Sequence, residues 1–412
     1  MVALTLREKL AILSDAAKYD ASCASSGGAH RDSLRSRGIG STDGSGICHS
    51  YAPDGRCISL LKILLTNFCI YDCSYCVNRS SSNVRRARFT VDEIVRLTMN
   101  FYRRNYIEGL FLSSGVVRSP EQTMEEMIEV ARRLREEERF AGYIHLKTIP
   151  ECSPELIERA GLYADRLSIN VELPTDEGLM RFAPEKRPDT IRVSMAKLRV
   201  KIEEKAERKP ASKRMPRFAP AGQSTQMIIG ADATPDADIL ETSQRLYSSY
   251  RLRRVYYSAF SPIPDASKAL PLVEPPLMRE HRIYQADWLM RFYGFSQREI
   301  FDGDSTGMLD LEVDPKLAWA LRHRGAFQVD VNKASREMLL RVPGLGVKVV
   351  DRLLASRRFR RLRLEDIGRL CRSVAKVRPF IVAAGWSPGG LVDDERLRRK
   401  LKPAPLQLGL FA

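Results

Sequence analysis

Residues 67–76 read Asn-Phe-Cys-Ile-Tyr-Asp-Cys-Ser-Tyr-Cys and follow a run of β-forming residues at 59–65. Cys69, Cys73 and Cys76 are therefore spaced C-x3-C-x2-C in a loop that directly follows a predicted strand. Three thiolates at this spacing can bind three separate irons of one iron–sulfur cube, because a short loop can turn its side chains inward. The loop holds no fourth cysteine, so one iron is left open. An open metal position is typical of a site that binds and activates a ligand.

A zinc site and an electron-transfer cluster are the two alternatives to this interpretation. Both also use cysteine thiolates in short loops. The eight cysteines in a chain of 412 residues, without a secretory signal at the N-terminus, are poor candidates for a disulfide framework.

Outward from this loop, the sequence from residue 58 to residue 265 alternates short β-rich runs with helical segments. This alternation predicts an α/β domain with a parallel sheet built from βα units. Six strands with intervening helices predict a partial barrel. Helix starts are marked by a capping box from Thr90 to Glu93 and by Ser119 before a proline. The strands are predicted at 59–65, 109–113, 143–148, 166–171, 226–230 and 254–260.

The cysteine loop after the first strand, with Tyr75 directly before the third cysteine, resembles the radical S-adenosylmethionine (SAM) enzymes. The resemblance implies a partial (β/α)6 barrel and a [4Fe–4S] cluster held by three cysteines. The fourth iron would bind the amino and carboxylate groups of SAM. One-electron reduction, by a donor such as flavodoxin or ferredoxin, would cleave SAM to methionine and a 5′-deoxyadenosyl radical.

The same resemblance implies further SAM contacts at the ends of later strands. The turn after the second strand, which in this family contacts the methionine amino group, is here a degenerate match. The fourth strand presents polar residues at alternate positions, which places them on one face, and the fifth strand ends in a glycine that resembles the family's adenine contact. The cofactor-binding candidates are Tyr75, Ser113, Ser114, Gly115, Ser168, Asn170, Glu172 and Gly230.

The other cysteines allow two hypotheses each. Cys152 follows the third strand, where barrel loops reach the active face, so it is a candidate catalytic donor of a hydrogen atom, or an inert thiol. Cys23, Cys48 and Cys57 lie in or just after a Gly- and Ser-rich stretch that predicts a loop. They are either ligands of an auxiliary cluster or reduced thiols of a loop that covers the main one.

The C-terminal quarter carries most of the positive charge. The chain has a net charge of +16, and residues 316–412 hold 22 Lys and Arg against 8 Asp and Glu. Two predicted short helices flank a Pro-Gly-Leu-Gly turn, whose uncovered N–H groups can bind a phosphate. This segment resembles the helix-hairpin-helix motif, which grips the DNA backbone without reading sequence. The DNA-binding candidates are Gly344, Leu345, Gly346, Val347 and Lys348.

Taken over residues 19–385, the chain resembles a bacterial group of radical SAM proteins described as acting in DNA modification or repair. The resemblance implies DNA as substrate and a companion protein similar to uracil-DNA glycosylases. An RNA-modifying radical SAM enzyme and a non-catalytic iron–sulfur sensor that binds DNA remain alternatives. The predicted domains are an N-terminal helix with a Gly/Ser/Cys-rich extension at 1–57, a barrel at 58–265, a helical connector at 266–325 and a helix-hairpin-helix domain at 326–412.

The composition also bears on where the protein acts. Hydrophobic residues make up 44% of the chain and charged residues 29%. No window approaches 18 uninterrupted apolar residues, so no transmembrane helix and no membrane partner are expected. The first residues reach charged side chains too early for a secretory signal. We therefore expect a cytoplasmic protein.

Overall fold

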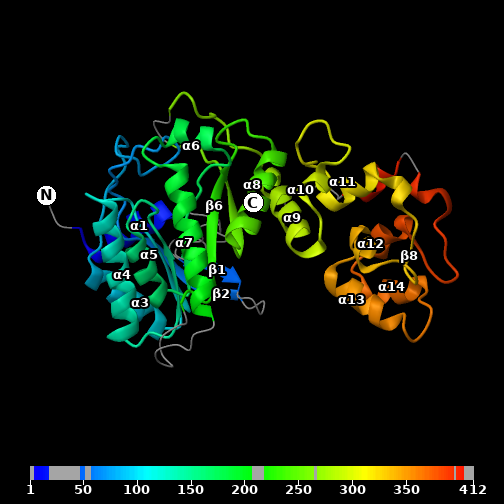
Figure 1. Ribbon diagram of the computed structural model, residues 1–412, viewed down its shortest axis with the longest axis horizontal. Coiled ribbons are helices and arrows are strands. Elements are labelled where there is room, and N and C mark those ends of the chain that lie inside the picture. Colours follow the sequence, from blue (N-terminus) through cyan, green and yellow to red (C-terminus); the bar gives the residue numbers. More distant parts are fainter. Residues whose placement is uncertain are drawn as a thin grey trace, which may run out of the picture. The chain divides into compact units, whose positions relative to one another are not determined.

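The computed structural model describes residues 4–17, 47–51, 57–206, 218–263, 267–393 and 396–402. The chain divides into two compact units, which Figure 1 traces in sequence colours. The first unit comprises residues 1–234 and 245–275, and the second comprises residues 235–244 and 276–412. Cys23 lies outside the described residues.

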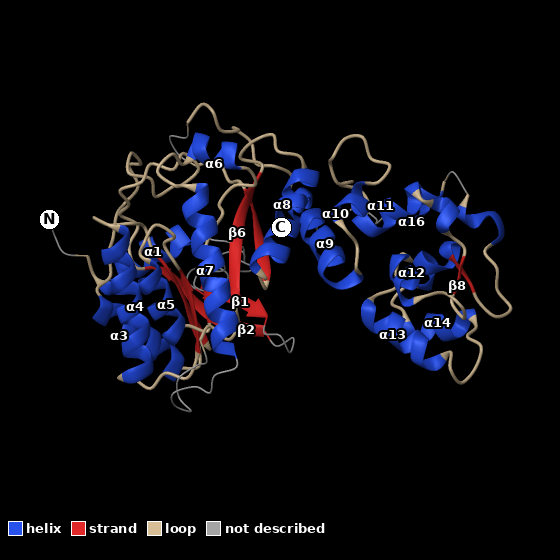
Figure 2. Cartoon of the chain, viewed as in Figure 1, coloured by secondary structure: helices blue, strands red, loops and turns tan. Residues whose placement is uncertain are grey.

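The first unit is built on a seven-stranded sheet in which the strands follow their sequence order, β1 to β7. Strands β2 to β7 are parallel to one another and form the curled half-barrel that the sequence predicts. Figure 2 shows the strands beside their covering helices. The parallel strands are β2 (Cys57–Leu64), β3 (Gly109–Ser113), β4 (Tyr143–Lys147), β5 (Arg166–Ser168), β6 (Gln223–Ile229) and β7 (Arg254–Ala259).

Strand β1 (Ile47–Tyr51) differs from the sequence-based expectation. The Gly- and Ser-rich composition around it predicts a loop, yet Ile47 to Tyr51 pair antiparallel with β2, Ile47 lying opposite Leu61. Ile, Cys, His, Ser and Tyr have no uniform alternation of polar and apolar side chains, so a local pattern does not reveal this strand. Cys48 lies in β1 and Cys57 begins β2, and the structure does not describe their side chains.

Helices follow the parallel strands in turn, as expected for βα units. The predicted capping box is present, since Thr90 Oγ1 accepts from the Glu93 N–H and the Glu93 carboxylate accepts from the Thr90 N–H. Ser119 caps the next helix, and Pro120 follows it as predicted. Helix α1 (Leu6–Ala17) contacts β2. The other helices are α3 (Val91–Arg103), α4 (Pro120–Glu136), α5 (Pro154–Tyr163), α6 (Asp176–Phe182), α7 (Pro188–Ala206) and α8 (Asp236–Tyr250), of which the last spans both units.

The second unit is mostly helical. Its aromatic core includes Trp319, which contacts Phe295 and Phe327, and Phe327 in turn contacts Phe380. A short parallel pair joins β8 (Val329–Asp330) to β9 (Ile381–Val382). The helices are α9 (Leu277–Tyr293), α10 (Gln297–Phe301), α11 (Pro315–Arg322), α12 (Arg336–Arg341), α13 (Val347–Ser356), α14 (Leu364–Leu370), α15 (Val374–Val377) and α16 (Leu397–Leu401), with 3-10 turns at Arg324–Ala326, Arg378–Phe380 and Gly389–Val392.

In α9, apolar residues at helical spacing, among them Ile283, Trp288 and Leu289, predict one packed face. This prediction is wrong for Trp288, whose side chain is 51% exposed. Ile283 and Leu289 are buried as predicted. Across the described residues, no helix combines the length and apolar character needed to cross a bilayer.

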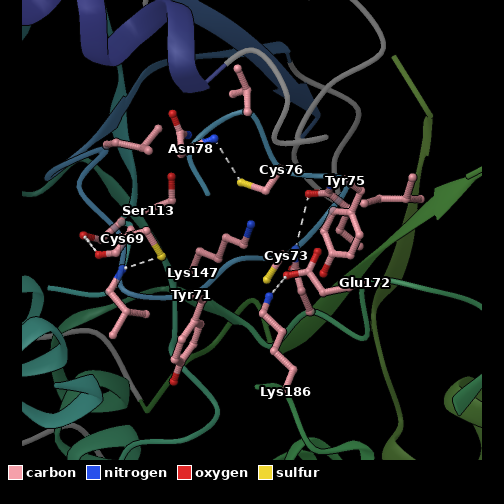
Figure 3. A pocket seen from close by; sticks show the side chains of 18 of the residues that line it. Cys69, Tyr71, Cys73, Tyr75, Cys76, Asn78, Ser113, Lys147, Glu172 and Lys186 are labelled. Atoms are coloured by element: carbon pink, nitrogen blue, oxygen red, sulfur yellow. Dashed lines mark hydrogen bonds and ion pairs between the residues drawn. The ribbon is translucent and has the colours of Figure 1, made fainter. Parts of the chain in front are cut away.

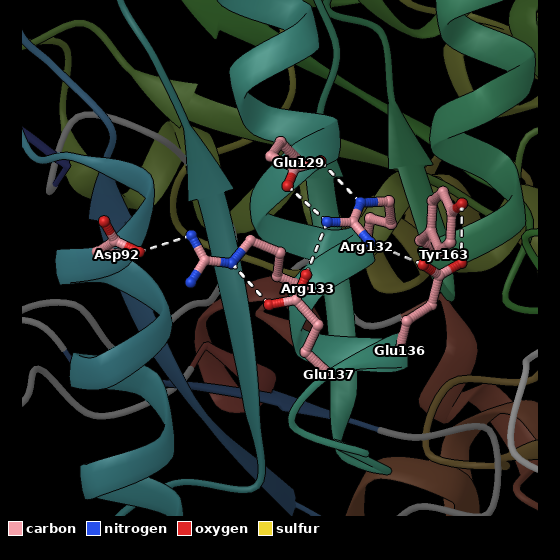
Figure 4. A network of polar contacts seen from close by, with 7 residues as sticks. All are labelled: Asp92, Glu129, Arg132, Arg133, Glu136, Glu137 and Tyr163. Atoms are coloured by element: carbon pink, nitrogen blue, oxygen red, sulfur yellow. Dashed lines mark hydrogen bonds and ion pairs between the residues drawn. The ribbon is translucent and has the colours of Figure 1, made fainter.

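Helix α4 carries two kinds of arginine contact at its C-terminal half. On the exposed side, Arg132 binds Glu129, Glu136 and Glu137 (Figure 4). On the buried side, Arg135 donates to the carbonyls of Tyr163, Phe140 and Gly142 and to Asp165 Oδ2 at 2.7 Å. Arg135, itself buried, thus satisfies backbone carbonyls of two loops.

We expect these two arginines to differ sharply in their contribution to stability. Arg135→Met leaves three backbone carbonyls without this donor and the Asp165 carboxylate without its ion-pair partner, which costs about 3 kcal/mol or more. Arg132→Ala removes only exposed ion pairs, which water screens and which therefore contribute little to stability. Equilibrium urea denaturation of both variants and the wild type measures the difference, and equal losses would contradict the assignment.

Candidate active site

The three loop cysteines line a cavity of about 170 Å³ at the carboxyl ends of the parallel strands. Figure 3 shows Cys69, Cys73 and Cys76 on the wall of this cavity, with Lys147 and Lys186 extending toward them. Residues in or just after β3, β4, β5, β6 and β7 add to the lining. The sheet therefore brings the cysteine loop and residues from five other strands or their loops to one place, which is where ligands bind in parallel α/β folds.

Hydrogen bonds fix the path of the cysteine loop. Arg86 donates to four backbone carbonyls, two through each terminal nitrogen. Asn67 adds a reciprocal pair, since its Nδ2 donates to Arg85 O at 2.8 Å and its Oδ1 accepts from Ala87 N at 2.7 Å. The carbonyls that Arg86 binds belong to Asn67, Asn78, Arg79 and Ser82.

The turn after β3 is joined directly to the cysteine loop. Gly115 N donates to Thr66 O at 2.8 Å, and Ile70 N donates to Val116 O at 2.8 Å. A Cβ at Gly115 would lie 2.3 Å from Phe68 O, so this position requires glycine. The sequence places Ser113, Ser114 and Gly115 at a cofactor contact, and the structure adds that Gly115 also seats the loop.

Two backbone N–H groups point at the cysteine sulfurs. Val116 N lies 3.4 Å from Cys69 Sγ, and Asn78 N lies 3.4 Å from Cys76 Sγ. Burial raises the pKa of Cys73 to about 12 and that of Cys76 to about 11. Without metal these groups are thus neutral thiols, and metal binding must displace their protons. Donors to sulfur stabilise the resulting thiolates.

A buried ion pair stands beside the cysteines. Lys186 Nζ lies 2.6 Å from Glu172 Oε1, and the two side chains are 16% and 8% exposed. Burial alone would lower the pKa of Lys186, but the nearby Glu172 carboxylate reverses this, and the pKa lies well above its ordinary value. Glu172 has a φ of +65°, a left-handed conformation that turns the chain after β5 into the cavity.

Two further polar groups on the cavity wall have no partner. Within the described residues, neither Tyr75 Oη nor either carboxylate oxygen of Glu151 has a hydrogen bond. Burial raises the pKa of Glu151. Lys147 also lines the cavity, at the end of β4. Buried polar atoms are normally satisfied, so Glu151 and Tyr75 indicate that a polar ligand belongs here.

Most of the residues predicted for the cluster, for SAM binding and for catalysis line this cavity, and three do not. Ser168 and Gly230 are not among the lining residues, and Gly230 packs its α-carbon against Pro275 instead. Cys152 is buried beside the lining residue Glu151, and its sulfur lies 3.6 Å from Ser153 O. The predicted residues that do line the cavity are Cys69, Cys73, Cys76, Tyr75, Ser113, Ser114, Gly115, Asn170 and Glu172.

Sequence reasoning missed Lys147, Glu151 and Lys186. Lys147 had a usable signal, because residues 143, 145 and 147 alternate onto one face of a strand whose end reaches the site. Glu151 precedes Cys152 directly, and the turn after β4 decides which of the two faces the cavity. Lys186 lies in the loop between α6 and α7, where no local pattern marks it.

Residues 63–204 match the family model described as the Radical SAM superfamily. The chain contains a radical SAM domain. The Radical SAM superfamily uses a [4Fe–4S] cluster and S-adenosylmethionine as cofactors. No curated protein matches the chain.

Three solved structures are partly similar to this chain. HydG from Carboxydothermus hydrogenoformans, a maturase of the FeFe-hydrogenase, is 14% identical over 55% of this chain and 50% of its own, with a TM-score of 0.42. Methylornithine synthase is 14% identical over 55% of this chain and 60% of its own, with a TM-score of 0.40. A second HydG structure is 12% identical, covers 55% of this chain and 48% of its own, and has a TM-score of 0.41. This chain thus spans about half the length of the HydG structures that it matches.

The residues of the cavity fit the two cofactors. No three His, Cys, Asp or Glu side chains of the described chain are arranged to hold a single metal ion. An iron–sulfur cluster does not need three ligands around one ion, because each thiolate binds a separate iron. Cys69, Cys73 and Cys76 would hold such a cluster. The free carboxylate of Glu151 suits an ammonium group, and Lys147 and Lys186 suit a carboxylate. Once bound and reduced, these cofactors supply a 5′-deoxyadenosyl radical.

Gly115→Ala should reduce cluster loading. The added methyl group would overlap the Phe68 carbonyl and push the cysteine loop away from β3. We expect the iron content after anaerobic reconstitution to fall several-fold below that of the wild type. Ser114→Ala is the matched control, because Ser114 Oγ bonds the neighbouring Gly115 O and not the loop. Full iron loading of Gly115→Ala would contradict this role.

The Glu172–Lys186 pair should be strongly coupled. Either Glu172→Gln or Lys186→Met alone leaves a buried charge without its partner, which costs about 3 kcal/mol. The double variant removes both charges, so it should lose less than the sum of the single losses. Urea denaturation of the four metal-free proteins closes this cycle, and additive losses would show that the two residues are independent.

Proposed function

We propose that the protein is a radical SAM enzyme that modifies or repairs a DNA nucleotide. The observation that carries the proposal is the combination of a radical SAM domain with a second unit whose hairpin presents a helix N-terminus between lysines. The second unit would bind the DNA backbone. The radical would abstract a hydrogen atom from a nucleotide at the cavity, giving 5′-deoxyadenosine and a nucleotide radical.

The hairpin between α12 and α13 has the features of a phosphate site. Gly344 has a φ of +86°, which favours glycine, and Gly346 begins α13 without a side-chain cap. The first turn of a helix without such a cap offers N–H groups and a positive dipole end to an anion. Leu345 is buried and packs the turn onto the unit, and Gly344 is exposed.

A buried lysine anchors the hairpin, and two further lysines lie beside its turn. Lys316 Nζ donates to Leu345 O at 2.6 Å. Lys348 is exposed in the first turn of α13. Lys376 lies alongside, with its Cβ 3.3 Å from the point that a Cβ on Gly344 would occupy. Sequence reasoning missed Lys376 because it is distant along the chain.

This arrangement supports backbone binding rather than sequence reading. Phosphate contacts from lysine and helix N–H groups position nucleic acid without discriminating bases. To reach a base or sugar in a duplex, the enzyme would have to extrude the nucleotide. A companion protein similar to uracil-DNA glycosylases, and a flavodoxin or ferredoxin as reductant, complete the proposal as partners.

Two alternatives to this function can be tested by the same experiment. An RNA-modifying enzyme would use the same radical and the same phosphate contacts. A non-catalytic iron–sulfur sensor would bind DNA and leave chemistry to its companion. The charge of the C-terminal quarter favours a nucleic acid in each case.

The deciding experiment measures 5′-deoxyadenosine from SAM with reconstituted, anaerobically reduced protein, with and without DNA or RNA. Stimulation by DNA supports the proposal, and stimulation by RNA alone favours the RNA enzyme. No product under any condition favours the sensor. Iron analysis of the same sample distinguishes one cluster, at about four irons per chain, from two clusters, at about eight. A second cluster would support Cys23, Cys48 and Cys57 as its ligands.

Lys348→Gln should weaken duplex binding at every sequence. Removing one phosphate contact lowers the magnitude of the slope of log K against log salt by about 0.9. Lys402→Gln is the control, because Lys402 already pairs with Glu312 at 2.6 Å and contributes little free charge. Fluorescence anisotropy with one duplex at several salt concentrations measures both. Equal slopes for Lys348→Gln and the wild type would remove Lys348 from the interface.

A further inference from the structure

The turn that follows α13 exposes a phenylalanine among arginines. Residues 357–361 read Arg-Arg-Phe-Arg-Arg. The Phe359 side chain is 88% exposed, more than any other large hydrophobic side chain in the described part of the chain. Single exposed apolar residues are common on protein surfaces, so its meaning depends on whether the turn is held rigidly and on what surrounds it.

Hydrogen bonds on both sides hold this turn in place. Arg357 Nη1 donates to Ala334 O at 2.7 Å and to Val331 O at 3.2 Å. Phe359 N donates to Ser356 O at 3.2 Å, which continues the end of α13. Leu362, buried just after the turn, donates its N–H to Asn332 Oδ1 at 2.7 Å. The exposed ring is therefore presented by an anchored backbone.

The arginines of the turn have divided tasks. Arg357 is occupied by the backbone contacts above, and Arg360 pairs with Asp366 at 2.6 Å. Within the residues that the structure describes, the side chains of Arg358 and Arg361 have neither a hydrogen bond nor an ion pair, and both residues are exposed. Two outward cations on either side of an outward aromatic ring match a nucleotide, which offers a flat base and anionic phosphates.

We propose that this turn binds an unpaired DNA nucleotide, with the base stacked on Phe359 and the flanking phosphates on Arg358 and Arg361. The inference deepens the proposed function, on which it rests, by adding a site that requires an unstacked base. The site lies one helix away from the hairpin. Helix α13 has 10 residues, so the two sites are about 15 Å apart along it, or about four base-pair steps.

A base-stacking role makes a different prediction from that of a simple charged surface. Phe359→Ala should weaken binding of a single-stranded oligonucleotide by about 5- to 100-fold. The salt slope should stay unchanged, because the ring releases no counterions. Arg358→Gln should instead lower the magnitude of that slope by about 0.7. Duplex binding should change less in Phe359→Ala, because paired bases are stacked on one another.

The test uses the full chain and a single-stranded 12-mer with one central 2-aminopurine, alongside the same strand in a duplex. Stacking on an aromatic ring quenches 2-aminopurine fluorescence. We expect quenching with the wild type and with Phe359→Trp, and its loss with Phe359→Ala and Phe359→Leu. The leucine variant separates stacking from plain apolar contact. Thermal unfolding should match the wild type, since Phe359 is exposed.

Two failures are distinguishable. If the wild type binds the duplex and the single strand with a normal salt slope, but Phe359→Ala binds and quenches equally well, the stacking site is wrong and the proposed function stands. If Phe359→Leu retains full quenching, the contact is not aromatic stacking and the inference is again overturned. If the wild type binds neither DNA at about 50 mM salt, where phosphate contacts are strong, both proposals fail.

Discussion

The first half of the cysteine loop is held in place by hydrogen bonds, because it buries little apolar surface. Phe68 and Ile70, its two large apolar residues before the second cysteine, are 46% and 49% exposed. Packing therefore does not fix this half, and hydrogen bonds from Arg86 and from the turn after β3 hold it. The thiols are positioned before iron binds, which lowers the conformational entropy that cluster assembly has to overcome.

The hairpin of the second unit is also held by a hydrogen bond, here from a buried amine. Lys316 donates to Leu345 O beneath the turn, and burial lowers the pKa of Lys316 to about 7. An amine donates a hydrogen bond whether or not it is protonated, so the anchor persists on either side of neutral pH. Lys348 and Lys376, on the other side of the turn, do not have to anchor it. One residue thus supports the hairpin backbone, and other residues supply the positive charge beside it.

The sequence predicts the sheet well and the site in part, for a physical reason. Parallel strands are buried on both faces and read as continuous apolar runs, as Leu110 to Leu112 show, and their helices begin at recognisable caps. Lys186 reaches the cavity from a loop that only tertiary folding places there. Strand β1 also cannot be predicted from its local sequence, because it is a strand through its pairing with β2 and not through its composition. Trp288 shows that helical periodicity locates an apolar stripe without telling which of its edges is covered.

The charges of the cavity also account for residues that no motif marks. Lys147 and Lys186 are balanced by Glu151 and Glu172, so the described polar lining is formally neutral while the thiols are protonated. Three thiolates on an oxidised cluster leave a net negative charge, and the sulfonium of SAM brings a positive one, so the filled cavity is neutral again. Charge left unbalanced in such a site is costly. The lining would therefore suit the two cofactors together better than either alone, and the ammonium group of SAM would give a partner to Glu151, whose carboxylate has no hydrogen bond in the described chain.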